Sequence, residues 1–384
     1  MTTHQTYSLK ELCLYFLKLG TLGFGGPVAL VGYMHRDLVD QRKWISEEEY
    51  REGLALSQLA PGPLAAQLGI YIGYVHYGLL GATLAGTAFV IPSFLMVIAL
   101  GWAYTQYGGL PWMQAIFYGV GAAVIGIITV SSYKLTTKSI GKDWLLWGIF
   151  AVLAITTFLF EEELVWLILL SGVIVWLIKT PPSWLTTRTA NSMLPTLFAQ
   201  VQVVSTENKL WQIALFFTKA GAFVFGSGLA IVPFLYGGVV KEYAWLNEKE
   251  FLDAVAVAMI TPGPVVITVG FIGYLVAGFW GAVVAALATF LPCYIFTVLP
   301  APYFKKYGKH PAIKAFVDGI TAAAIGAIAG AVIVLGKRTL IDLPTIVIAI
   351  VTAALLIRFK KLQEPYAIAA AAVVGIVIKT ILNL

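Results

Sequence analysis

The chain has 384 residues, of which 59% are hydrophobic and 11% charged, and its mean hydropathy is +0.86. Soluble globular proteins carry about 25% charged residues, so this composition excludes an ordinary soluble fold and predicts helices that lie in a bilayer. The net charge of +6 does not indicate nucleic-acid binding, because the basic residues lie in short loops between apolar runs, as in the cytoplasmic loops of membrane proteins.

Each half of the chain contains six apolar segments. In the first half they cover about 12–30, 52–75, 79–104, 113–133, 144–160 and 164–179. In the second half they cover about 211–237, 252–276, 278–300, 313–336, 342–357 and 365–382. A helix needs about 20 residues to cross a bilayer, so these segments predict membrane helices. The residues before the first segment are polar, so we expect this segment, and not a cleaved signal peptide, to direct insertion.

One unit occurs twice in the chain. Three pairs of matching motifs are Phe16-Leu-Lys18-Leu-Gly20 and Phe217-Thr-Lys219-Ala-Gly221, Pro61-Gly62-Pro63 and Pro262-Gly263-Pro264, and Gly73-Tyr74 and Gly273-Tyr274. The spacing within a pair is 201 residues at first and 200 later. Chance does not hold a register over so long a stretch, so the sequence predicts an N-terminal repeat over 1–179, a linker over 180–209 and a C-terminal repeat over 210–384.

Two apolar segments of each repeat are interrupted, one by a glycine-rich stretch and the other by Pro-Gly-Pro. A broken helix is tolerated at membrane depth only where protein or a water-filled cavity covers the freed backbone groups. We therefore expect an all-α integral membrane protein in which each repeat has about five transmembrane helices and a re-entrant broken-helix hairpin. Five crossings per repeat make the two repeats inverted, and most Lys and Arg residues then fall on one side, as the positive-inside rule requires.

The first binding-site candidates are Lys18 and Lys219. Each lies within an apolar run at the same position of its repeat, and a charge inside the membrane marks a functional site by default. The alternative is that each lysine extends its ammonium group to the membrane surface. The symmetric placement favours an anion-binding role.

The glycine-rich breaks beside these lysines are candidates for backbone contacts to an anion. The residues are Gly25, Gly26, Gly226, Ser227 and Gly228. Glycines let successive N–H groups face one concavity, and a helix that restarts after the break adds the positive end of its dipole. Close packing between helices is the alternative.

The Pro-Gly-Pro breaks form a third set of candidates. Proline removes a backbone donor and frees a carbonyl, so Pro61, Gly62 and Pro63 enforce a turn, as do Pro262, Gly263 and Pro264. Polar side chains beside them can donate hydrogen bonds to oxyanion oxygens without adding charge; they are Gln58, Gln67, Thr261 and Thr268. A purely structural kink is the alternative.

Acidic residues open the helices before these breaks. Glu49 follows Ser46 and Glu250 follows Asn247 at the spacing of a capping box, and a role for Glu49 or Glu250 in proton coupling is left open. Further candidates near the expected helix starts are Asp253 and Asp318.

Catalytic and metal chemistry lack the residues that they need. The four histidines, His4, His35, His76 and His310, fall in expected loops or termini, and Cys13 and Cys293 lie in apolar runs. Clustered carboxylates or thiolates for a metal cation, and a nucleophile with its base, are absent from the apolar segments. We therefore expect no catalytic residue, no metal and no cofactor. Two lysines with N–H donors suit a tetrahedral dianion instead.

At this point the motifs resemble the chromate ion transporter superfamily, in its long, two-domain form. The matching stretches of the first half are Phe24-Gly-Gly-Pro27, Trp44-Ile-Ser-Glu-Glu-Glu49, Gln58-Leu-Ala-Pro-Gly-Pro63, Tyr71-Ile-Gly-Tyr74 and Pro92-Ser-Phe94. Those of the second half are Phe225-Gly-Ser-Gly228, Trp245-Leu-Asn-Glu-Lys-Glu250, Thr261-Pro-Gly-Pro264, Phe271-Ile-Gly-Tyr274 and Pro292. Ser227 and Gly228 depart from Gly26 and Pro27, so the two halves are not equivalent at the site.

The resemblance implies a secondary active transporter in the bacterial inner (cytoplasmic) membrane that exports chromate by alternating access. Sulfate or another oxyanion is the alternative substrate, because sulfate shares the charge and shape of chromate. An intramembrane enzyme is disfavoured by the missing catalytic groups, and flux kinetics would distinguish a channel. We expect the lipid bilayer and chromate as partners and no nucleic acid, and we leave a homodimer open.

Overall fold

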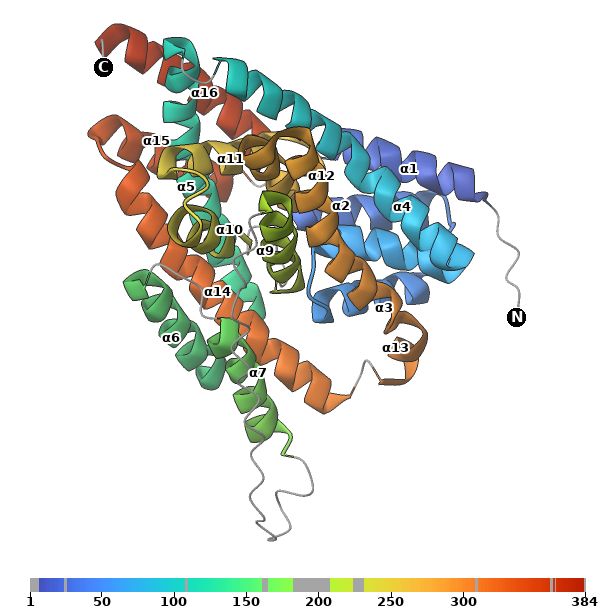
Figure 1. Cartoon of the computed structure of the whole chain (residues 1–384). Coiled ribbons are helices and arrows are strands. Elements are labelled where there is room, and N and C mark those ends of the chain that lie inside the picture. The colour runs from blue at the N-terminus through green and yellow to red at the C-terminus, as the bar shows by residue number, and fades with distance from the viewer. Residues whose placement is uncertain are drawn as a thin grey trace.

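The protein is described here from a computed structural model, which covers residues 7–23, 26–107, 110–160, 165–181, 208–223, 231–307, 310–359, 362 and 364–382. These residues form helices and short connections and contain no strand (Figure 1). The chain is therefore an all-α protein over its described part. The predicted linker lies almost wholly outside the described residues.

The helices follow the same order in each half. The first half has α1 (Leu9–Leu22), α2 (Gly26–Met34), the π-helix η1 (His35–Gln41), α3 (Glu47–Leu59), α4 (Leu64–Tyr107), α5 (Pro111–Ser139), α6 (Trp144–Phe160) and α7 (Val165–Lys179). The second half has α9 (Lys209–Phe223), α10 (Ile231–Leu235), the π-helix η3 (Tyr236–Glu242), α11 (Glu248–Ile260), the 3₁₀-helix η4 (Val265–Ile267), α12 (Thr268–Val298), α13 (Ala301–Tyr307), α14 (Pro311–Thr339), α15 (Leu343–Arg358) and α16 (Glu364–Leu382).

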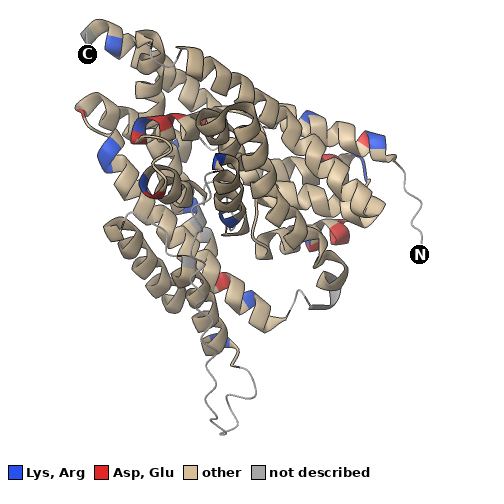
Figure 2. Cartoon of the chain, in the orientation of Figure 1, with Lys and Arg blue, Asp and Glu red and all other residues tan. Residues whose placement is uncertain are grey.

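Five helical stretches among the described residues are long and apolar enough to cross a membrane. They are Leu64–Tyr107, Pro111–Lys134, Val265–Phe304, Pro311–Thr339 and Glu364–Ile381. The two longest helices, α4 and α12, contain no Asp, Glu, Lys or Arg, and Figure 2 shows the charged residues gathered mainly toward the ends of the other helices. Because such surfaces need an apolar solvent, the chain is a multi-pass membrane protein.

The first Pro-Gly-Pro forms the tip of a helical hairpin. Glu49 at the start of α3 lies 3.9 Å from His76 on α4, and Glu52 accepts a 3.5 Å hydrogen bond from Tyr71. Gly53 packs against Tyr71 as well. Residues near the start of α3 therefore pair with residues far along α4, so the two arms lie antiparallel. We call the segments 47–76 and 248–276 hairpin 1 and hairpin 2.

Matching backbone features recur in hairpin 2 and beyond. The predicted capping boxes are confirmed, because Glu49 accepts from the N–H of Ser46 at 3.0 Å and Glu250 from that of Asn247 at 2.9 Å. Gly78 and Gly278 both have φ +63°, and each marks a kink that separates a hairpin arm from the long helix after it. These kinks lie at the boundaries that the hydrophobic pattern predicts.

The two halves exchange their last helices. Helix α5 packs against α15 and α16 of the second half, and α14 packs against α6 and α7 of the first. Glycines permit the close approach: Gly119 meets the carbonyl of Ala371, and its counterpart Gly319 meets that of Ser171. The helical core of each half is thus completed by the other half.

Helices α5 and α14, which occupy equivalent positions in the repeats, run antiparallel where they meet. Gly121 lies beside Thr339, and Ile125 lies beside Gly336, so residue numbers rise along one helix as they fall along the other. In Figure 1 the N-terminal end of α14 lies at the end of the molecule opposite the start of α5.

Two equivalent polar clusters cap the opposite ends of this exchanged core. At one end Lys179 contacts Asp143 at 2.5 Å, and at the other Tyr118 donates to Asp342 at 2.7 Å while Lys379 lies 4.8 Å from the centre of the Tyr118 ring. The Lys179 ammonium group holds the pKa of Asp143 below its usual value. Through Tyr118 of α5, the second cluster joins the first repeat to the second.

Candidate functional site

The tips of the two hairpins meet the opposite half of the molecule. The N–H of Gly263, in the tip of hairpin 2, donates a 3.0 Å hydrogen bond to the carbonyl of Gly23, directly after α1. A Cβ at Gly263 would also overlap Ser93 Oγ on α4. In the tip of hairpin 1, a Cβ at Gly62 would lie 3.0 Å from Cys293 Sγ on α12.

This contact is reciprocal. Ser93 and Cys293 are 200 residues apart and occupy the same place in the two repeats. Each therefore receives the hairpin tip of the other half. We call this region the tip junction; its residues are Gly20, Gly23, Pro61, Gly62, Pro63, Ser93, Pro262, Gly263, Pro264 and Cys293.

Glycine is required at both tips. Gly62 has φ +141° and Gly263 has φ +91°, which are backbone conformations that other residues rarely adopt. The space beside them is also filled, by the Gln67 side chain and Cys293 at one tip and by Ser93 at the other. The sequence motif thus folds into two turns that allow very close approach of the other half.

Helical segments begin directly after both tips of the junction. Helix α4 begins directly after Pro63, and its first residues Ala65 and Ala66 are buried. N–H groups in the first turn of a helix have no partner within it, and the helix dipole adds partial positive charge there. The segment after Pro264 repeats this arrangement with buried Val266. Such ends suit a bound anion.

Gln67 is the buried polar side chain at the tip of hairpin 1. Its side chain is fully buried, and Nε2 donates a 2.8 Å hydrogen bond to the carbonyl of Pro61. Oε1, which can only accept, is buried without a hydrogen-bond partner, so the group of this amide that could donate to an anion is the second N–H of Nε2. The predicted candidate Gln67 therefore lies at the junction.

The other polar candidates are placed differently. Thr261 and Thr268 are buried at hairpin 2, but their hydroxyls donate to the carbonyls of Ala258 and Val265. These two hydroxyl protons are therefore committed to the backbone. Gln58 is exposed on α3.

Lys18 and Lys219 lie on exposed faces of α1 and α9. They are two residues before Gly20 and Gly221, which pack against the carbonyls of Phe89 and Thr289 in their own halves. Of the glycine-rich candidates, Gly25, Gly226, Ser227 and Gly228 lie outside the described residues, and Gly26 begins α2.

Two buried residues, Ser93 and Cys293, were not singled out for the site by the motifs, and Asp253, one of the further candidates, is buried as well. Ser93 and Cys293 lie in apolar runs, and only their contacts with the hairpin tip of the other half place them at the junction. Asp253 is 4% exposed in α11 and accepts a 2.7 Å hydrogen bond from Tyr104, so it ties hairpin 2 to the end of α4.

The expectation that all four histidines lie in loops or termini is wrong for two of them. His35 is in η1 and contacts Glu47 at 2.8 Å, and the side chain of His76 is buried in α4 beside Glu49. The error arose because the segment boundary at the kink left His76 between two predicted helices. Metal-ligand clusters of His, Cys, Asp and Glu are absent from the described part of the chain.

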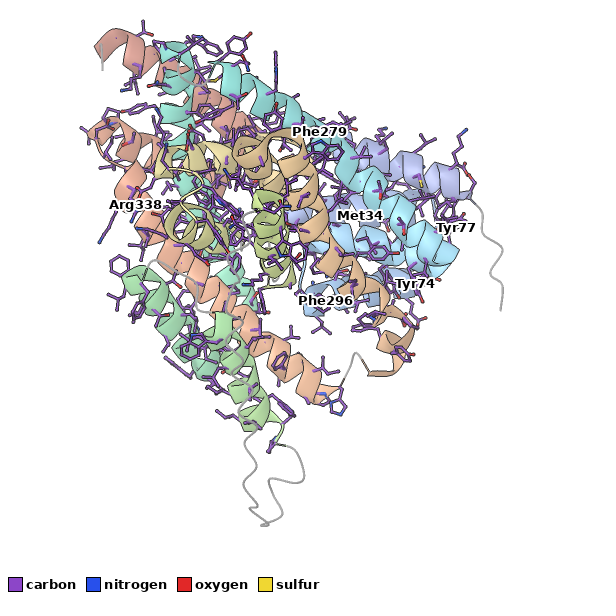
Figure 3. All side chains as sticks on the ribbon, viewed as in Figure 1. Met34, Tyr74, Tyr77, Phe279, Phe296 and Arg338 are labelled. Atoms are coloured by element: carbon purple, nitrogen blue, oxygen red, sulfur yellow. The ribbon has the colours of Figure 1, made fainter. Side chains whose placement is uncertain are left out.

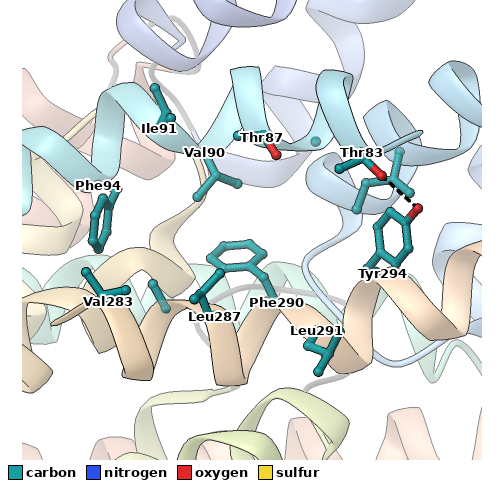
Figure 4. Close-up of a pocket in the computed structure, with 13 residues that line it drawn as sticks. Thr83, Thr87, Val90, Ile91, Phe94, Val283, Leu287, Phe290, Leu291 and Tyr294 are labelled. Atoms are coloured by element: carbon teal, nitrogen blue, oxygen red, sulfur yellow. Dashed lines mark hydrogen bonds between the residues drawn. The ribbon is translucent and has the colours of Figure 1, made fainter. Parts of the chain in front are cut away.

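A separate groove lies between α4 and α12, with a volume of about 490 Å³ (Figure 4). Its walls are equivalent residues of the two repeats, such as Val90 and Phe290, and a 2.9 Å hydrogen bond joins Thr83 and Tyr294 across one end. The lining is almost wholly apolar, so this groove does not suit an oxyanion.

The fold and the junction define a class of protein. Interrupted helices that meet at the boundary between two repeats, within a multi-pass membrane protein, are the arrangement that transporters build around a solute.

The chain belongs to the chromate transporter family, whose model matches residues 10–176 and 211–376. Members of this family are transport proteins and not enzymes. The two matched segments correspond to the two repeats.

Named relatives cover almost the whole chain. A chromate transport protein of Cupriavidus metallidurans is 67% identical over an alignment of 384 positions that covers 99% of this chain and 96% of the relative. A probable chromate transport protein of Synechococcus elongatus is 65% identical over 382 residues, 97% of this chain and 96% of the relative. A chromate transport protein of Pseudomonas aeruginosa is 30% identical over 89% of this chain and 84% of its own length. No solved structure matches the chain.

Proposed function

We propose that the protein is a secondary active transporter that exports chromate from the bacterial cytoplasm across the inner membrane. The observation that carries this proposal is the tip junction, where each repeat places a Pro-Gly-Pro turn and the helix start after it against the other half, with buried Gln67 at the tip of hairpin 1. The names of the relatives support chromate as the substrate. The helix N-termini at the two tips would add partial positive charge to that of the lysines in stabilising the oxyanion.

The proposed topology is a pair of inverted repeats. The antiparallel contact of α5 with α14 supports it, as do the equivalent clusters at opposite ends of the core. Figure 3 adds that Tyr77, at the base of hairpin 1, and Arg338, which pairs with Glu248 at the base of hairpin 2, lie on opposite sides of the molecule. Each hairpin would then be re-entrant from its own side of the membrane.

Inverted repeats suggest how transport proceeds. With the tips at the midplane and the bases on opposite sides, movement of one hairpin opens the junction to one side while the other hairpin keeps it closed. This is alternating access about a fixed site. Lys18 and Lys219 would neutralise the dianion near the junction. A homodimer remains a separate prediction.

Inside-out membrane vesicles that carry the protein provide the test. We expect energised accumulation of chromate that sulfate inhibits weakly, with vesicles lacking the protein as the control. Accumulation of sulfate in preference to chromate would identify sulfate as the substrate and would leave the proposed oxyanion site unchanged. Movement of neither anion would overturn the proposed function.

A further inference from the structure

The base of hairpin 1 contains a buried imidazole beside a carboxylate. His76 is the last regular residue of α4 before the kink at Tyr77 and Gly78, and its side chain is 7% exposed. Its Nε2 lies 3.9 Å from Glu49 Oε2, on the first turn of α3. The pair therefore joins the two open ends of the hairpin, about 20 Å from the tip at 1.5 Å per helical residue.

Aromatic side chains cover this pair. The Tyr7 ring lies 5.6 Å from the imidazole, and Trp44 stacks on Tyr7 at 4.5 Å. Tyr77 donates a hydrogen bond to the carbonyl of Tyr7. This cover limits water at the imidazole, which strengthens its interaction with any nearby charge.

The other charged and titratable groups around the pair come from three elements. On α3, Glu52 lies one turn after Glu49 and is hydrogen-bonded by Tyr71 of α4. Arg42, in the connection before α3, lies 4.5 Å from the centre of the Trp44 ring. Glu11 of α1 is within electrostatic reach of Tyr77. Glu49 is thus the carboxylate with a direct contact to His76.

Hairpin 2 lacks the imidazole. Glu250 occupies the position of Glu49, and Val276 occupies that of His76. The site is therefore present in one repeat only, although the backbone of the hairpin is repeated.

We propose that His76 and Glu49 form a proton-binding site that couples protonation to the opening of hairpin 1. This inference rests on the proposed transport function. A proton from the adjoining aqueous phase adds to the neutral imidazole, and the imidazolium pairs with the Glu49 carboxylate. The pair then holds the bases of the two arms together, and loss of the proton releases them. Histidine suits this task because its ordinary pKa lies near 6.5.

The protonated His76–Glu49 pair, which we call the clamp, can be tested by a measurement that does not depend on transport. Hydrogen–deuterium exchange, corrected for intrinsic rates, is followed over 47–59 and 64–76 in detergent at pH 6 and pH 8. We expect slower exchange at pH 6 in the parent protein and no such difference in His76→Val, which has the residue found in hairpin 2. His35→Gln is the matched control, because His35 also contacts a glutamate of α3 but is partly exposed, and it should behave like the parent. The same pH difference in His76→Val would overturn the proposal.

A second measurement links the clamp to transport. The initial rate of chromate uptake into inside-out vesicles should change several-fold between pH 5.5 and pH 8 in the parent and in His35→Gln, because the His76–Glu49 pair gains its proton on the acid side of this range. It should change less than about twofold in His76→Val and in His76→Gln, which retains a polar side chain if the valine variant inserts poorly.

The outcomes separate the two proposals. Absence of chromate movement in the parent would overturn the proposed function, while the exchange experiment would still decide on the clamp. Transport with an unchanged pH profile in both His76 variants would overturn the coupling role and leave chromate export in place.

Discussion

The two hairpins have the same backbone and are held by different side chains. At the base of hairpin 1 the contacts are between histidines and glutamates of the first half: His35 with Glu47 and His76 with Glu49. At the base of hairpin 2, Arg338 of α14 pairs with Glu248 and donates to Tyr236, the counterpart of His35. Hairpin 1 is thus held by imidazole–carboxylate contacts, and hairpin 2 by the guanidinium group of Arg338.

The tips of the two hairpins also differ in how firmly they are held. Gly62 faces a thiol and the flexible Gln67 side chain, whereas Gly263 is hydrogen-bonded to Gly23 and faces Ser93. Asp253 of hairpin 2 is tied to Tyr104, but its counterpart Glu52 has a longer contact with Tyr71. The repeat thus conserves the shape of both hairpins and ties hairpin 2 more firmly. In an alternating-access cycle, this asymmetry predicts that hairpin 1 moves more readily.

The largest expected effect is a loss of chromate uptake when Lys18 or Lys219 is replaced. Comparing the two variants shows whether both halves contribute equally to anion binding. Removing a charge-assisted contact costs about 1.5–3 kcal/mol, so Lys18→Ala and Lys219→Ala should each lower chromate uptake by roughly tenfold or more. Uptake is measured in vesicles at matched protein levels, with Lys209→Ala at the start of α9 as the control. A loss in only one variant would assign the anion mainly to one half. Full uptake in both would remove the lysines from the site.

We expect alanine substitutions of the two tip glycines, Gly62 and Gly263, to lower the stability of the protein by different amounts. Both substitutions meet an unfavourable φ, but Gly263→Ala adds a severe clash on Ser93 Oγ, whereas Gly62→Ala adds a milder one on the far end of the Gln67 side chain. We expect Gly263→Ala to lower stability by about 1–3 kcal/mol and to lower it more than Gly62→Ala, as judged by thermal unfolding in detergent. Ser93→Ala should restore part of the loss in Gly263→Ala. Equal effects of the two alanines, without any rescue, would contradict the described tip contacts.

We expect the buried hydrogen bond between Tyr104 and Asp253 of hairpin 2 to stabilise the protein more than its counterpart between Tyr71 and Glu52 of hairpin 1. Tyr104→Phe removes the hydroxyl that hydrogen-bonds buried Asp253, and leaving such a group unpaired costs about 1–3 kcal/mol. Tyr71→Phe removes a 3.5 Å contact to Glu52 and should cost less than about 0.5 kcal/mol. Thermal unfolding of the two variants gives the comparison. A larger loss in Tyr71→Phe would reverse our ranking of the hairpins.

The smallest expected effect is on how the stability of the protein depends on pH through the Lys179–Asp143 contact, at one end of the exchanged core. Because Lys179 lowers the pKa of Asp143 in the folded protein, this group adds stability above its unfolded pKa of about 3.9 and loses it as the pH falls through the lower folded pKa. Lys179→Met should therefore reduce stability slightly at pH 7 and have no effect near pH 2. A pH series of unfolding temperatures, with exposed Lys142→Met as the control, would show this. A loss that persists at the acid end would contradict an ionic origin.

The sequence by itself determined the membrane class, the two repeats, the capping boxes and the kinks, since these depend on composition, register and residues close along the chain. Ser46 and Glu49, for example, are only three residues apart, so their spacing alone predicts the cap. The Pro-Gly-Pro turns were predictable for the same reason, and with them the position of Gln67.

Only the tertiary structure decided which groups meet. Ser93 and Cys293 become junction residues because the exchanged halves bring each hairpin tip to the other half, and apolar periodicity carries no information on such long-range partners. His76 became a candidate only when the antiparallel arms placed it beside Glu49, 27 residues earlier. The packing of α5 with α16 and of α14 with α7 likewise depends on glycine faces that fit only in three dimensions.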